Sequence, residues 1–78
     1  MKTMTCQQLG GPCDLALRGE NADEVIQAQD RHLKDAVAAG DLTHEAANNE
    51  MRGRWKHPKK SLGWYFATKK AFAELPED

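Results

Sequence analysis

Two cysteines that flank a glycine–proline turn place the strongest constraint on how this chain can fold. Cys6 and Cys13 are separated by six residues, and the Gly-Gly-Pro sequence at positions 10–12 lies between them. Glycine and proline in succession mark a turn. We therefore predict a β-hairpin over residues 1–19, with a cysteine on each side of its loop and both sulfur atoms brought to one side.

Three helices are expected after the hairpin. Asn21 is a good N-cap for the first helix, and Glu24 stands where a capping box places its acidic residue. Gly40 is a natural end for that helix, and Pro58 suits the first position of the third. The predicted helices span residues 22–39, 43–55 and 58–75. The predicted fold class is therefore α+β, a short cysteine-bearing hairpin followed by three helices.

The apolar positions predict which side of each element faces the core. Leu15 and Leu17 are two residues apart, as on the buried face of a strand. The predicted inward-facing positions fall near helical spacing, and those of the first helix are Val25, Ile26, Leu33, Ala36 and Val37. Those of the second are Ala46, Ala47, Met51 and Trp55, and those of the third are Ser61, Trp64, Tyr65, Thr68, Ala71, Phe72 and Leu75.

The length of the chain favours an additional source of stability. Its 78 residues leave room for one domain, and domains of this size often add a disulfide or a structural metal. The first residues lack the apolar core of a signal peptide, and no apolar run approaches the roughly 18 residues of a membrane span. We therefore expect a cytoplasmic protein, and in a reducing compartment paired cysteines are more often metal ligands or reactive thiols than a disulfide.

Two histidines complete a candidate metal site with Cys6 and Cys13. Thiolates and imidazoles are the ligands of tetrahedral structural zinc. His32 lies on the apolar face of the first predicted helix, and folding that helix over the hairpin would aim it at the cysteines. His44 begins the second helix and is the candidate fourth ligand. The spacing Cys-x6-Cys-x18-His-x11-His is not that of the common zinc fingers.

The position of His44 raises a geometric difficulty. In a plain antiparallel helix pair, His32 would lie about 12 Å before the end of its helix, at about 1.5 Å per residue. His44 follows the turn almost at once. Either the first helix ends early, or the two helices cross steeply, or His44 is not a ligand.

Each candidate ligand also has an ordinary structural explanation. Cys6 and Cys13 could form a disulfide, act as a redox-sensing dithiol or be inert buried thiols. His32 could be a packed core histidine, and His44 could simply belong to the first turn of its helix. His57, ahead of a proline, is expected on the surface.

Catalytic arrangements are not apparent in the sequence. His44-Glu45 begins like the metalloprotease sequence H-E-x-x-H, but Asn48 replaces the second histidine. A chain this short can hardly enclose a substrate pocket as well as a metal site. We therefore do not expect an enzyme, although a metalloenzyme with three protein ligands and a bound water stays open.

Charge and aromatic residues are distributed unevenly. Residues 1–50 carry four basic and nine acidic side chains, whereas residues 51–78 carry seven basic and three acidic ones and all five aromatics. The basic and aromatic segment 52–70 could bind nucleic acid through phosphate contacts and stacking, or be a solvated face. Leu62 and Phe66 lie off the predicted stripe, so they are either core or an exposed patch for a protein partner.

The sequence resembles an uncharacterised bacterial family of predicted small metal-binding proteins, a domain-of-unknown-function group. The resemblance covers essentially the whole chain and is most specific over residues 1–14. The matching positions are residues 1–6, Leu9-Gly10-Gly11, Cys13-Asp14, Glu24-Val25, His32, Gly40-Asp41, His44, Trp64 and residues 75–78.

The resemblance implies metal binding by Cys6, Cys13, His32 and His44, and implies no reaction or substrate. Members of the family place a second histidine about five residues after the first. Val37 occupies that position here and cannot bind a metal. Either His44 is the fourth ligand in its place, or the fourth coordination position of the metal is not filled by the protein. The resulting hypothesis is a small zinc-binding protein with a structural site, acting as an interaction or regulatory module.

Overall fold

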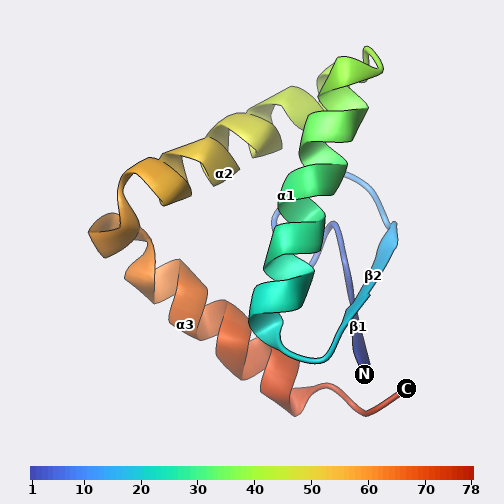
Figure 1. Ribbon diagram of the computed structural model, residues 1–78, viewed down its shortest axis with the longest axis vertical. Helices are drawn as coiled ribbons and strands as arrows, with labels where there is room; N and C mark the ends of the chain where they lie inside the picture. The colour runs from blue at the N-terminus through green and yellow to red at the C-terminus, as the bar shows by residue number, and fades with distance from the viewer.

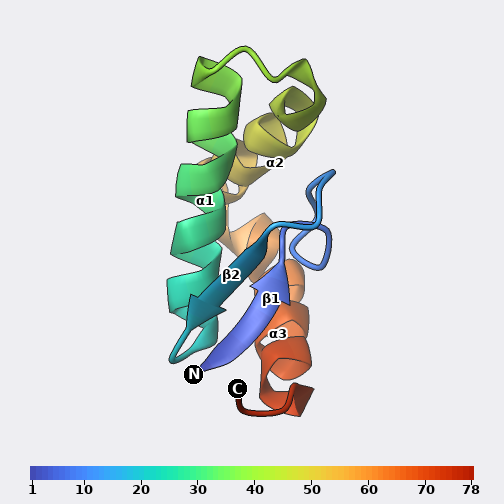
Figure 2. The ribbon, with the colours of Figure 1, turned by 90° about the vertical axis from the view of Figure 1, so that its right-hand side faces the viewer.

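The computed structural model describes residues 1–78 as an antiparallel hairpin packed against three helices (Figures 1 and 2). In chain order the elements are β1 Lys2–Thr5, β2 Ala16–Gly19, α1 Ala22–Ala38, the 3-10 helix η1 Leu42–His44, α2 Glu45–Lys56 and α3 Pro58–Glu74. The predicted α+β class is confirmed. The second predicted helix differs most, because its first turn is the separate helix η1. No helix combines the length and apolar character needed to cross a membrane.

The hairpin holds the two cysteines opposite each other. Met4 of β1 pairs with Leu17 of β2, and both side chains are buried. Beyond the strands, Cys6 N donates to Leu15 O and Gln7 N donates to Cys13 O, both at 2.9 Å. The prediction that Leu15 shares the buried face of Leu17 is wrong, since β2 begins only at Ala16 and Leu15 is 47% exposed.

The start of α1 follows the predicted capping. The Asn21 side chain accepts a hydrogen bond from the Glu24 backbone N–H at 3.0 Å, which satisfies one of the free donors at the helix start. The Glu24 carboxylate accepts a hydrogen bond from the Glu20 backbone N–H, whereas a capping box would use the backbone N–H of Asn21. From this start, α1 buries Val25, Ile26 and Leu33 in the core.

The end of α1 sets the direction of the chain that follows. Gly40 has a φ of +93°, and its N–H donates to Val37 O at 3.0 Å. The next N–H, of Asp41, donates to Ala36 O at 2.9 Å. These two bonds form a Schellman motif, which favours glycine because only glycine adopts a positive φ without strain.

One apolar cluster joins the hairpin to all three helices. Its buried members are Met4, Cys6, Leu9, Leu17, Ala22, Val25, Ile26, Leu33, Ala47, Met51 and Phe72. Trp55 is not part of this core, because its side chain is 55% exposed at the end of α2. Leu62 and Phe66 are also exposed, so the structure favours the surface-patch interpretation of these two residues over burial in the core.

The hairpin also holds the end of α3. Lys2 Nζ donates to Phe72 O at 3.2 Å and Ala73 O at 3.0 Å, which places a cation at the negative end of the helix dipole. Asp78 accepts hydrogen bonds from the Thr3 hydroxyl at 2.7 Å and from Arg18 Nε at 3.0 Å. The two ends of the chain therefore lie together, as Figure 1 shows.

Candidate metal centre

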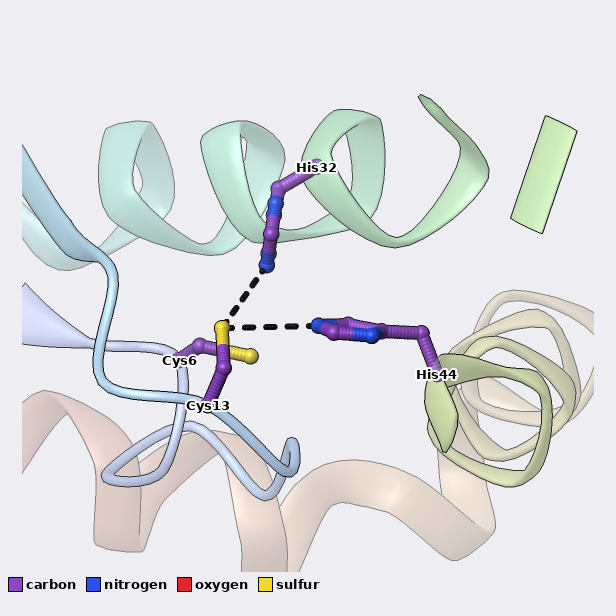
Figure 3. Close-up of side chains that lie close together, drawn as sticks. All are labelled: Cys6, Cys13, His32 and His44. Carbon is purple, nitrogen blue, oxygen red and sulfur yellow. Dashed lines mark hydrogen bonds between the residues drawn. The ribbon is translucent and has the colours of Figure 1, made fainter. Parts of the chain in front are cut away.

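Four candidate ligand atoms converge between the hairpin loop and the turn after α1. Cys6 and Cys13 come from the loop, His32 from α1 and His44 from η1 (Figure 3). Their ligand atoms all lie within 4.8 Å of one another. The Cys13 sulfur lies 3.3 Å from His32 Nε2 and 3.4 Å from His44 Nε2. The structure thus brings together all four residues that the sequence analysis selected.

The turn between α1 and α2 carries His44 to the cluster. After Gly40, the chain forms η1, and α2 then leaves α1 at a steep angle instead of running back beside it (Figure 1). Of the three alternatives raised by the sequence, the steep crossing is the one that the structure shows. The rings of His32 and His44 meet edge to face, with centroids 4.9 Å apart and planes at 88°. This arrangement leaves both Nε2 atoms directed at the Cys13 sulfur.

The two distances from the Cys13 sulfur agree with a tetrahedral metal site. Bonds of about 2.3 Å to sulfur and 2.0–2.1 Å to nitrogen place neighbouring ligand atoms roughly 3.3–3.8 Å apart in a tetrahedron. Both distances from the Cys13 sulfur fall in that range. The two cysteines are free thiols, so no disulfide competes for the sulfur atoms. A set of two thiols and two imidazoles is the donor chemistry of tetrahedral zinc or iron sites.

Cys6 is the most enclosed of the four residues. Its side chain is fully buried, and Gln29 Nε2 donates to its sulfur at 3.2 Å and to its carbonyl oxygen at 3.3 Å. Gly11 N donates to the same carbonyl at 2.8 Å. A Cβ at Gly11 would stand 2.2 Å from the Cys6 sulfur, so only glycine permits this approach of the loop backbone. The glycine that marked the turn in the sequence is therefore also part of the site.

His44 is oriented by Asp41. The Asp41 Oδ2 atom lies 2.9 Å from His44 Nδ1, and Thr43 Oγ1 lies 3.2 Å from the same nitrogen. A hydrogen bond from the Thr43 hydroxyl is the main cause that lowers the pKa of Asp41, which keeps this side chain ionised. A carboxylate on Nδ1 holds the proton there and leaves Nε2 free to bind a metal.

The protonation states of the cluster suit the uptake of a cation. Burial, together with the neighbouring His44, lowers the pKa of His32, so this ring is neutral at pH 7. A backbone hydrogen bond from Leu15 lowers the pKa of the Cys13 thiol. Burial, Cys6 and Asp14 outweigh this effect and raise that pKa overall. A bound cation reverses this balance, because a thiol that coordinates a metal is deprotonated.

Sequence reasoning missed the supporting roles of Gln29 and Asp41. Each precedes a candidate histidine by three residues: Gln29 lies three before His32 and Asp41 three before His44. In a helix this spacing places Gln29 on the face of His32. A glutamine among the apolar positions Ile26 and Leu33 is the sequence signal that could have identified it, and the structure buries it fully. Asp41 entered the sequence analysis only as one of the positions that match the small metal-binding family.

Other sequence candidates lie away from the cluster. His57 is exposed between α2 and α3, and Val37 is half-buried in α1. Comparison with protein-family models, curated proteins and solved structures finds no match to this chain. The resemblance to the small metal-binding family therefore stays a prediction.

Proposed function

We propose that this protein binds one zinc ion through Cys6, Cys13, His32 and His44, and that the metal completes the fold of a small interaction or regulatory module. The observation that carries the proposal is the convergence of four ligand atoms within 4.8 Å. Four protein ligands fill a tetrahedral site and leave no position for water or substrate. The ligand count therefore favours a structural role over catalysis.

The position of the cluster in the fold supports a structural role. It joins the loop between β1 and β2, helix α1 at His32 and the short helix η1. The loop itself contributes only Cys6 and Leu9 to the buried core. A metal ion would hold these three segments together, and the free energy of its binding would add to the free energy of folding.

Native mass spectrometry of the freshly purified, untagged protein, with elemental analysis, tests the proposal. We expect a mass increase of one zinc ion per chain, which is lost in Cys13→Ser. His57→Gln is the matched control, because His57 is exposed and outside the cluster, and it should keep the metal. A metal-free protein with both thiols free and an intact fold would contradict the proposal.

A redox-sensing dithiol is the second candidate function. It is favoured by two free thiols in one cluster, of which Cys13 is only half-buried. Hydrogen peroxide would take two electrons from the two thiolates, forming the Cys6–Cys13 disulfide and leaving as water, with release of the metal. Thiol titration and metal release under mild peroxide, followed by recovery with dithiothreitol, test this function. Retention of metal and both thiols under these conditions would exclude it.

A further inference from the structure

A second feature, separate from the metal cluster, is a cleft among the three helices. Its volume is about 440 Å³, and none of the four candidate ligands lines it. Ile26 of α1, Met51 of α2 and Leu62 of α3 contribute apolar walls from each helix. The cleft is therefore an apolar depression on the side of the molecule where α2 and α3 meet.

The apolar surface continues from the cleft onto exposed side chains. Trp55 and Leu62 line the cleft and are 55% and 45% exposed, and Phe66 lies one turn after Leu62 and is 60% exposed. Phe66 stacks on Tyr65, another lining residue, with ring centroids 5.8 Å apart. Large apolar side chains gathered in this way are typical of surfaces that bind another protein.

Arg54 adds a cationic group to the cleft wall. Its guanidinium lies 4.0 Å above the Trp64 ring. Glu50 Oε2 lies 3.7 Å from Arg54 Nη2, and the side chains of Arg54 and Glu50 are 19% and 65% exposed, so the guanidinium is mostly enclosed with one edge reaching solvent. A guanidinium carries five N–H donors in a fork that fits a carboxylate. Arg54 therefore offers a carboxylate-binding group beside an apolar depression.

The charge near the cleft also favours an acidic partner. Lys56, Lys59 and Lys60 line a second depression that adjoins the cleft at Pro58. The one acidic residue of the cleft wall, Asp23, accepts a hydrogen bond from the Tyr65 hydroxyl at 2.6 Å. Single-stranded nucleic acid also favours positive charge, but it needs open aromatic faces along a groove. Here Arg54 covers the Trp64 ring and Tyr65 stacks on Phe66, so Trp55 is the lining aromatic without a ring partner, and Ile26, Met51 and Leu62 form much of the cleft. An apolar cleft with positive charge beside it fits an acidic, amphipathic protein segment better than it fits single-stranded nucleic acid.

We propose that this cleft binds an acidic amphipathic helix of a partner protein, with apolar side chains packed between Trp55 and Leu62 and a carboxylate paired with Arg54. Binding of an apolar helix face in a hydrophobic groove is a common mode of peptide recognition. The surrounding lysines attract the acidic face of the helix, so binding weakens as salt screens these charges. The proposal does not depend on the identity of the metal.

Selection from a displayed library of random helical peptides, with the full-length protein as bait, tests the proposal. The enriched peptides should combine acidic residues with large apolar residues spaced by three and four. Fluorescence anisotropy with one such peptide should show about tenfold weaker binding to Leu62→Ser and to Arg54→Gln, the loss expected for a central contact.

Matched variants separate local loss of binding from general damage. Leu42→Ser removes an exposed leucine outside the cleft, and Arg31→Gln removes an exposed arginine of α1. Both should bind the peptide like the parent protein. Metal content and thermal unfolding of all four variants show whether the fold is intact, which also keeps this test distinct from that of the metal site.

Three outcomes would overturn the proposal. The first is the absence of enriched acidic and apolar peptides, or binding that Leu62→Ser and Arg54→Gln leave unchanged. The second is tighter binding of an oligo-dT strand than of any selected peptide, with the same dependence on Arg54. The third is a concentration-dependent dimer in sedimentation that Leu62→Ser abolishes, since the cleft would then be covered by a second copy of this chain.

Discussion

The Asp41 carboxylate lies 2.9 Å from Nδ1 of His44, on the side of the ring opposite the nitrogen that faces Cys13. The two residues are three apart and belong to one short turn, in which Asp41 also accepts a hydrogen bond from Thr43 N at 3.0 Å. One side chain thus caps η1 and orients a candidate ligand. The capping of this turn and the geometry of the cluster are therefore coupled.

We expect Asp41→Asn to weaken metal binding by roughly tenfold to a hundredfold, the usual cost of losing such a supporting carboxylate. Asparagine is as good an N-cap as aspartate, so the turn itself should persist. Competition with a chromophoric chelator measures the change. Asp35→Asn on the exposed side of α1 is the control. Equal affinities of Asp41→Asn and the parent protein would show that Asp41 has no role in the site.

Removal of the metal should strongly destabilise the fold. At a free metal concentration of about 1,000 times Kd, binding adds roughly 4 kcal/mol to the free energy of unfolding. For a domain of this size that corresponds to a fall in Tm of about 16–30 °C on chelation. Thermal unfolding followed by circular dichroism, with and without a chelator, measures this. A melting curve that the chelator does not change would be incompatible with a structural metal.

The chain offers a matched pair of glycine substitutions. In Gly11→Ala the new methyl group meets the Cys6 sulfur at 2.2 Å, and we expect a loss of about 1–3 kcal/mol together with weaker metal binding. Gly63→Ala, in α3, meets no atom within 4 Å and should stabilise the helix by about 0.5–1 kcal/mol. Urea unfolding and metal titration of both variants test the pair. Equal effects would show that the loop does not need close contact with Cys6.

Gln29→Met should cost about 0.5–1.5 kcal/mol, because it preserves the volume but removes the hydrogen bonds that Gln29 donates to Cys6. The cost stays small because the Cys6 carbonyl still accepts from Leu9 N and Gly11 N, and the buried Gln29 Oε1, which has no partner, is removed as well. Metal affinity should fall as well, since the Cys6 sulfur loses the side-chain contact that holds its position. Gln27→Met, at an exposed position of the same helix, is the control for unfolding in urea. A Gln29→Met protein as stable as this control would mean that the buried amide contributes only by packing.

Local sequence signals predicted the elements of this fold well. These signals act within a few residues, so they can be recognised in the sequence without knowledge of the whole fold. They are the glycine–proline turn, the Asn21 cap, Gly40 and Pro58. The prediction for Leu15 failed because alternation of side chains holds only inside a paired strand. Its carbonyl still pairs with Cys6 N, but its side chain lies beyond the start of β2.

The sequence by itself determined the hairpin, the three helices and the residue types that can form a tetrahedral site, because turn chemistry, caps and ligand chemistry are local properties. Only the tertiary structure decided that His44 reaches the cysteines, since this depends on the steep departure of α2 from α1 after the turn at Gly40. It also decided that Leu62 and Phe66 are exposed. Helical spacing shows which residues share a face, but the packing of neighbouring elements decides which face is buried.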